Sequence, residues 1–198
     1  MQKALEYLLI SLMLAVLSTP ILAQEAEELR KFTSLEEALA VQPAEVKYLE
    51  LKRERFTEIP KDVFKFTKLE VLDLSKNKLR LVPTEIAQLQ SLKVLNLNKN
   101  KLETLPESIG NLKNLEQLIA SQNDLSQLPE SIGKLTQLKV LDLWSNNLGH
   151  LPKSIQTCKK LEVVDFRAIQ MTAAEQDAIR ALLPADVKIH FSNTCNCD

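Results

Sequence analysis

The chain has 198 residues, of which 45% are hydrophobic, so it is long enough to bury a sizeable core. Its 25 basic and 26 acidic residues give a formal net charge of −1, a balance that provides no overall attraction to DNA, RNA or anionic lipid. Only three glycines and 5% aromatic residues are present, fewer than a close-packed enzyme with many tight turns would use.

Residues 1–23 have the pattern of a secretory signal peptide. Lys3 supplies the positive start, an apolar run follows from Tyr7 to Leu17, and Ala23 is the small residue before the cut. The run is short for a membrane span of about 20 residues, which favours cleavage over an uncleaved anchor. We therefore expect an exported protein (periplasmic, cell-surface or secreted), with no membrane insertion after the signal is removed.

Residues 24–45 are predicted to form an N-terminal helical cap. Ser34 and Glu37 have the spacing of a capping box, and an apolar stripe follows within residues 35–40. Pro43 ends the predicted helix. A stack of repeats exposes the apolar face of its first member, so we expect this helix to cover it.

Residues 46–171 consist of a repeated unit, Leu-x-x-Leu-x-Leu-x-x-Asn-x-Leu-x-x-Leu-Pro-x-x-Ile-x-x-Leu. Near-complete copies begin at a constant step of 23 residues, at Leu69, Leu92, Leu115 and Leu138. Weaker copies begin in register at Val46 and Leu161. A fixed step of this size is typical of a solenoid, in which each unit buries its leucines against its neighbours.

The spacing within one unit predicts a strand followed by a short helical return. Leu95 and Leu97 flank a polar residue, as in a half-buried strand. After Asn100 the apolar residues recur every three or four positions, which suits a turn of 3₁₀ or α character. Pro106 has no N–H to donate and belongs at a turn or at the first helical position.

This motif resembles the leucine-rich repeats of the Leu-Pro-x-x-Ile class over about residues 46–191. The resemblance implies an α/β leucine-rich repeat solenoid. In this horseshoe the parallel sheet lies on the concave face and short helical returns lie on the convex face. Members of the class bind other proteins, so the resemblance also implies a protein partner.

One Asn per repeat falls at equal steps just after the predicted strand. This column consists of Asn77, Asn100, Asn123 and Asn146. An amide both donates and accepts, so the column can satisfy buried backbone groups in the turn of its own repeat and of the next. Glu54 replaces Asn in the first repeat, as expected for a terminal repeat with no preceding turn to serve.

Residues 172–191 are predicted to form a C-terminal cap. Thr172 and Glu175 have capping-box spacing and begin a helix that Pro184 ends, and an edge strand follows to Phe191. Residues 192–198 are predicted to be a flexible tail. Its Cys195 and Cys197 could bridge each other, pair with another chain or stay free, whereas Cys158 occupies a leucine position and is predicted to be a core thiol.

The exposed face of the predicted sheet carries the main functional signal. Trp144 is the single tryptophan, and Ile119 lies one repeat earlier, both at positions normally polar in this class. An aromatic with a polar rim suggests a binding hot spot, although Trp144 could merely pack on its neighbours. The predicted partner-binding residues are Trp144, Ile119, Asp142, Asp165, Arg167, Asn96 and Asn98.

These patterns favour a non-catalytic, exported protein–protein interaction module that binds its partner on the concave face. We expect a monomer with no cofactor and no metal, because no spacing of His, Cys or acidic residues supports a catalytic or metal site. Two alternatives remain open at this stage. One is a surface or envelope structural protein without a specific partner, and the other is an enzyme with an unrecognised site.

Overall fold

The computed structural model describes residues 29–192. The predicted signal peptide and most of the predicted tail, including Cys195 and Cys197, lie outside these residues. From Lys31 onward the described elements form one compact unit, built as a stack of repeats. Between residues 29 and 192, no helix has both the length and the apolarity that a bilayer span requires.

A single sheet of parallel strands forms one side of this unit. The strands are β1 (Lys31–Phe32), β2 (Tyr48–Glu50), β3 (Val71–Asp73), β4 (Val94–Asn96), β5 (Gln117–Ile119), β6 (Val140–Asp142), β7 (Val163–Phe166) and β8 (Lys188–Phe191). Each pairs with the next strand in the chain, so the order in the sheet is the order in the sequence. Equivalent residues of successive repeats pair directly, as Leu72, Leu95 and Leu118 do.

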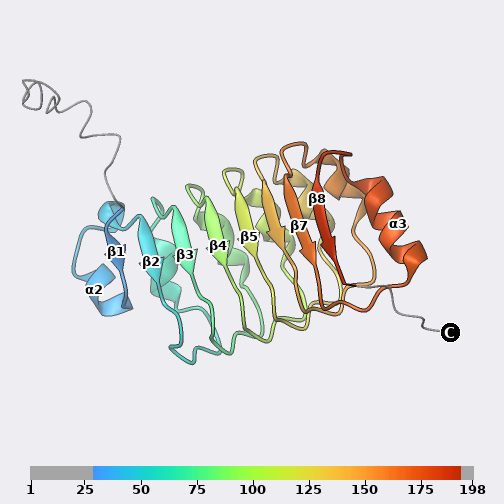
Figure 1. Cartoon of the computed structure of the whole chain (residues 1–198). Helices are drawn as coiled ribbons and strands as arrows, with labels where there is room; N and C mark the ends of the chain where they lie inside the picture. Colours follow the sequence, from blue (N-terminus) through green and yellow to red (C-terminus); the bar gives the residue numbers. More distant parts are fainter. Residues whose placement is uncertain (1–28, 193–198) are drawn as a thin grey trace, which may run out of the picture. The chain divides into compact units, whose positions relative to one another are not determined.

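Short 3₁₀ helices return the chain along the other side, behind the sheet in Figure 1. They are η1 (Pro43–Glu45), η2 (Lys61–Lys65), η3 (Thr84–Gln88), η4 (Glu107–Asn111), η5 (Glu130–Lys134) and η6 (Lys153–Thr157). A proline immediately precedes η2 to η6, where it fixes the backbone without losing a helical N–H bond. Strand leucines and helix isoleucines meet between the two sides, and Leu95, Leu97 and Ile109 are fully buried.

The buried Asn column bonds in one direction along the stack. Asn123 accepts from the Leu102 N–H at 3.0 Å, and its amide donates to the carbonyls of Ala120 and Leu97, also at 3.0 Å. Leu97 and Leu102 belong to the preceding repeat. The expectation that each Asn serves the next repeat was therefore wrong, because the side chain turns toward the N-terminal side of the stack, a direction that spacing does not encode.

Asn77, Asn100 and Asn146 repeat this arrangement. Asn77 accepts from the Phe56 N–H at 3.1 Å and donates to the Leu51 carbonyl at 2.7 Å, so it completes the turn of the first repeat. Glu54, in the Asn position of that repeat, has no earlier repeat turn to serve. Its exposed side chain is consistent with that arrangement.

The residue just before each Asn has a left-handed backbone. The positive φ values are 60° at Lys76, 57° at Lys99, 52° at Gln122 and 55° at Ser145. This conformation turns the chain out of the strand. It is costly for residues with a Cβ, yet none of these positions is glycine.

Glycine instead serves the contact between neighbouring 3₁₀ helices. A Cβ on Gly110 would lie 2.6 Å from the Cβ of Ser131, and one on Gly133 would lie 2.6 Å from the Cβ of Ser154. Both distances are far below van der Waals contact. Neither glycine has a positive φ, so close approach explains these two glycines.

At the N-terminal end a strand covers the first repeat. The helix α2 (Leu35–Leu39) is capped by Ser34, whose hydroxyl accepts from the Glu37 N–H at 3.1 Å. However, Ala38 is the one fully buried residue of α2, and Leu39 is 45% exposed. The apolar cover comes mainly from Phe32 of β1, which is completely buried and pairs with Leu49 of β2. The sequence did not predict this strand.

At the C-terminal end, α3 (Ala173–Leu182) begins with the predicted capping box, because Thr172 and Glu175 bond reciprocally. Strand β8 then adds to the sheet beside β7. The rings of Phe166 and Phe191 stack with centroids 5.6 Å apart, and the Arg180 guanidinium lies 4.8 Å from the Phe191 ring centroid. Helix and strand thus close the last repeat, at the red end of Figure 1.

Candidate functional site

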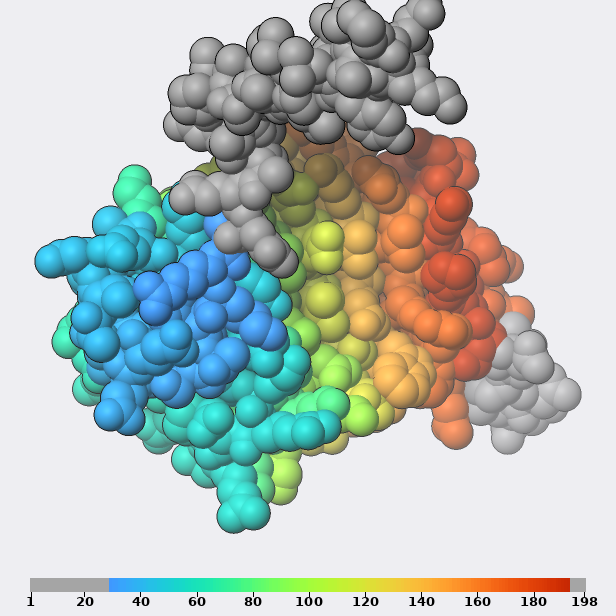
Figure 2. Space-filling model, turned by 60° about the vertical axis from the view of Figure 1, so that its left-hand side comes forward, coloured from blue at the N-terminus to red at the C-terminus, as the bar shows by residue number. Residues whose placement is uncertain are grey.

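The outward residues of the strands and of the positions just after them form a continuous surface, which we call the strand face. Its three columns run across β2 to β7. They contain Tyr48, Val71, Val94, Gln117, Val140 and Val163; then Glu50, Asp73, Asn96, Ile119, Asp142 and Asp165; then Lys52, Ser75, Asn98, Ser121, Trp144 and Arg167. Figure 2 views this side obliquely, with the N-terminal elements nearest.

Four residues of the middle column hold the backbone at the end of their strands. Asp73 accepts from the Ser75 N–H at 2.8 Å, and Asp142 accepts from the Trp144 N–H at 3.1 Å. Asn96 and Asp165 make the same bond to the residue two positions on. Ile119 cannot make it, because its side chain has no acceptor. Ile119 therefore lacks a bond that four of the six repeats make, while Glu50 of the first repeat instead pairs with Lys31 and Lys52.

Ser121 connects three strands beside Ile119. Its hydroxyl donates to Asp142 Oδ2 at 2.8 Å and lies 2.8 Å from Asn98 Nδ2, which donates to it. Two predicted binding residues, Asn98 and Asp142, are thereby linked through a residue that the sequence analysis did not select. Ser121 is buried, with 1% of its surface exposed, so this network forms the floor of the strand face.

Trp144 stands at the edge of this floor. It is 36% exposed and is one of three large hydrophobic residues with exposed side chains within residues 29–192, the others being Leu39 and Leu81. Its backbone N–H donates to Asp142 Oδ1, and its backbone carbonyl accepts from the Gln122 N–H at 2.7 Å. Ile119 pairs with Asp142 in the sheet, two residues before Trp144, so the two apolar side chains lie diagonally on adjacent strands.

Arg167 is held by Asp165 rather than left free. Its guanidinium bonds both carboxylate oxygens, with a closest N–O distance of 2.6 Å. Burial would raise the pKa of Asp165, but the bonds and charge of Arg167 outweigh it and keep that pKa below its usual value. The pair is compensated internally, so it presents a polar surface beside Trp144 rather than a net charge.

The N-terminal end of the strand face is more charged. Glu50 bonds Lys31 at 3.2 Å and Lys52 at 3.0 Å. Burial would raise the pKa of Glu50, but these two cations lower it below its usual value overall. The Lys31 ammonium also lies 5.8 Å from the centre of the Tyr48 ring. This end therefore differs chemically from the apolar and polar surface around Trp144.

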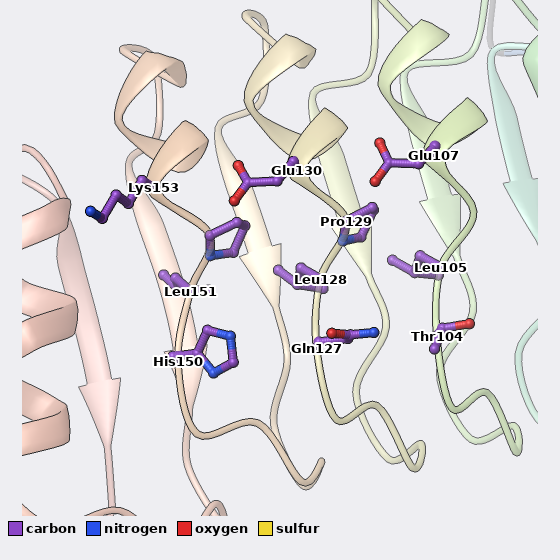
Figure 3. Close-up of a pocket in the computed structure, with 11 residues that line it drawn as sticks. Thr104, Leu105, Glu107, Gln127, Leu128, Pro129, Glu130, His150, Leu151 and Lys153 are labelled. Atoms are coloured by element: carbon purple, nitrogen blue, oxygen red, sulfur yellow. The ribbon is translucent and has the colours of Figure 1, made fainter.

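A groove of about 600 Å³ lies on the helical side (Figure 3). Equivalent residues of three successive repeats line it, for example Thr104, Gln127 and His150. The carboxylate of Glu107 accepts from the Ser131 N–H at 3.1 Å and so caps the next 3₁₀ helix. The groove is a consequence of stacking, and its lining brings together no nucleophile with a base.

Possible metal ligands do not cluster within residues 29–192, and the thiol in this range is buried. No group of three or more His, Cys, Asp or Glu side chains within residues 29–192 has the geometry of a metal site. Cys158 is fully buried in the core, and burial raises the pKa of its thiol to about 11. Its Sγ donates to the Ile132 carbonyl at 3.4 Å, so it is a structural thiol at neutral pH.

Comparisons with known families agree with this architecture. A model described as "Leucine-rich repeat region" matches residues 40–126, and one described as "Leucine Rich Repeat" matches residues 137–158. Among curated proteins, the search found no match.

Many solved structures are similar to this chain, and two of them illustrate the likeness. A leucine-rich repeat protein of Leptospira interrogans is 26% identical with a TM-score of 0.60, over 81% of this chain and 57% of that one. The plant peptide hormone receptor RGFR1 in complex with RGF2 is 32% identical with a TM-score of 0.62, over 82% of this chain and 26% of that one. The chain thus spans less than two thirds of either relative.

Proposed function

The chain is a leucine-rich repeat solenoid, and on that premise we propose that it is an exported, non-catalytic module that binds a protein partner on its strand face. The carrying observation is the exposed Trp144 over an ordered polar floor. The receptor RGFR1, similar in fold, is in complex with RGF2, which supports a protein or peptide as the ligand class here.

The surface around Trp144 has the composition of a binding hot spot. Tryptophan is enriched at such sites, which are apolar at the centre and polar at the rim. Trp144 and Ile119 supply the apolar centre, while Asp142 and the compensated pair of Asp165 and Arg167 supply the rim. Asn96 and Asn98 extend the polar surface toward β4. The backbone hydrogen bonds of Trp144 fix the base of its side chain, so the residue loses less conformational entropy when a partner binds.

Capture experiments with Trp144→Ala test this proposal. The protein lacking residues 1–23 would be immobilised and exposed to extracts of its source cells, and retained proteins would be measured by quantitative mass spectrometry. We expect Trp144→Ala to weaken a specific partner by about 2 kcal/mol or more, while thermal stability changes little. Leu81→Ala is the matched control, because Leu81 is also exposed but lies away from the strand face.

Each outcome of the capture experiment has a distinct meaning. A partner retained equally by wild type and Trp144→Ala would place the binding surface elsewhere. If no protein is enriched over a blank matrix at any concentration, the module has no specific partner in that extract, which would favour a structural role in the envelope.

Export is a separate part of the proposal. It rests on the apolar run that ends at Ala23, so the exported chain should begin at Gln24. N-terminal mass spectrometry of the protein recovered from its source cells measures this directly. An N-terminus at Met1 would contradict cleavage.

A further inference from the structure

Seven exposed cations gather in three successive turns at the carboxyl ends of the strands. These turns follow β2, β3 and β4, at the lower edge in Figure 1. The cluster, which we call the basic edge, consists of Arg53, Arg55, Lys76, Lys78, Arg80, Lys99 and Lys101. Within residues 29–192 none of the seven side chains forms an ion pair or a hydrogen bond.

The repeat itself does not require these cations. The equivalent positions of the next two turns carry neutral or acidic residues, namely Gln122, Asp124, Ser126, Ser145, Asn147 and Gly149. The backbone conformation is nevertheless the same, as the positive φ values of Lys99 and Gln122 show. The charge is therefore a property of one region of the surface and not of the fold.

Like charges held this close repel each other and attract an anionic partner. Adjacent strands lie about 4.8 Å apart, so equivalent cations of neighbouring turns are within one screening length of each other. The formal net charge of −1 hides this concentration, because acidic residues elsewhere balance it. A local positive potential of this kind accelerates and orients the docking of a complementary surface.

We infer that the basic edge binds an acidic segment of the protein partner that lies on the strand face. This inference rests on the proposed function, because the edge adjoins the strand face directly. Arg53, Lys76 and Lys99 each follow a residue of its third column. One partner can thus place an acidic segment on the edge and an apolar side chain at Trp144.

The surroundings favour a protein segment over a uniform polyanion. Exposed carboxylates of Glu54, Glu58 and Glu103 interrupt the basic edge, and Glu50 and Asp73 border it on the strand face. A polypeptide can set neutral or basic residues opposite these carboxylates, whereas a nucleic acid or an anionic bilayer cannot. The same three turns also present no exposed aromatic ring on which a base could stack.

Fluorescence anisotropy with a labelled peptide of alternating Glu and Ser tests the inference. We expect binding at low ionic strength that salt weakens, and no binding of the same peptide with Gln in place of Glu. A variant with Lys76→Gln, Lys78→Gln, Lys99→Gln and Lys101→Gln should bind at least ~10-fold more weakly. The control variant carries Lys61→Gln, Lys68→Gln, Lys134→Gln and Lys159→Gln. It loses the same charge at exposed positions away from the edge and should change by less than ~2-fold.

Equal binding by the two variants, or no binding of the acidic peptide, would overturn the inference. Heparin or phosphatidylserine vesicles that bind through the same lysines, while the peptide does not, would also overturn it and identify the edge as a polyanion surface. The peptide should bind Trp144→Ala as it binds wild type. Peptide binding can therefore fail while Trp144-dependent capture succeeds, or the reverse, so the two proposals are tested separately.

Discussion

The buried Asn column and the strand face come from the same repeating unit but obey different rules. Asn77, Asn100, Asn123 and Asn146 are the same residue and donate to equivalent carbonyls at 2.7 to 3.1 Å, because each must satisfy the same backbone groups. On the strand face, equivalent positions range from Ser121 to Trp144. A buried position that carries the same residue in every repeat is therefore one that the stacking requires. An exposed position where one repeat differs from the others marks surface that stacking does not constrain and that can serve a function.

The largest effect should come from breaking the column in its middle. Asn123→Leu removes the acceptor of the buried Leu102 N–H. It also removes one of the two amide donors to the Leu97 and Ala120 carbonyls, which keep those of Asn100 and Asn146. We expect a loss of about 3 kcal/mol in the free energy of unfolding, measured by urea titration. Asn111→Leu, an exposed Asn in η4, should cost less than about 0.5 kcal/mol. Equal midpoints for the two variants would refute the buried role.

A second change tests whether the close contact between neighbouring 3₁₀ helices is also required by the stacking of the repeats. Gly110→Ala inserts a Cβ into contact with the backbone and Cβ of Ser131, so η4 and η5 must move apart. We expect a loss of about 2 kcal/mol by the same titration. At Gly149 the nearest atom to a new Cβ is Glu175 Oε1 at 3.7 Å, so Gly149→Ala should leave stability unchanged or slightly higher. A harmless Gly110→Ala would show that the helices separate freely.

A third change restores the rule at the position of the strand face that departs from it. Ile119→Asn supplies an acceptor for the Ser121 N–H, as Asn96 does for Asn98. We expect a gain of about 0.5 to 1 kcal/mol in stability together with weaker partner capture, because the apolar centre loses Ile119. Gln117→Asn, on the same strand but without this geometry, should show no gain. A lower melting temperature for Ile119→Asn would mean that its packing outweighs the missing bond.

The smallest effect concerns the left-handed residues between the two regions. Ser145→Gly relieves the cost of a Cβ at φ 55°, partly offset by the greater freedom of glycine in the unfolded chain. We expect a gain of at most about 0.5 kcal/mol, detectable as a small rise in melting temperature. Ser145→Val should lower it, because a β-branched residue fits this conformation poorly.

The sequence predicted the parts of the fold that repeat. The 23-residue step, the strand positions and the buried Asn residues follow from periodicity, and the capping box of Thr172 and Glu175 follows from local chemistry. The two-residue strand β1 was missed, because its pairing depends on the neighbouring β2 rather than on a pattern of its own. The close approach at Gly110 was missed for the same reason, since it is defined by the next helix in the stack.

The candidate site was predicted less completely. Trp144 and Ile119 stood out because they are unusual for their columns, but Ser121 is small and ordinary in its column, and only the paired strands reveal its bonds to Asn98 and Asp142. One column of the basic edge, Arg53, Lys76 and Lys99, recurs at the 23-residue step just after the strands and can be read from the sequence. The second column, with Arg55, Lys78 and Lys101, lies beyond the left-handed turn, where strand alternation no longer says which way a side chain points.

The direction of the Asn bonds bears on how the protein is made. A chain emerging from the ribosome presents its repeats in order. A buried N–H in the turn of each repeat donates to the Asn of the following repeat, as the Leu102 N–H does to Asn123. Each newly emerged turn therefore lacks this acceptor until about one more repeat has been translated. Folding during synthesis should advance by whole repeats, with the growing end always one turn short of closure.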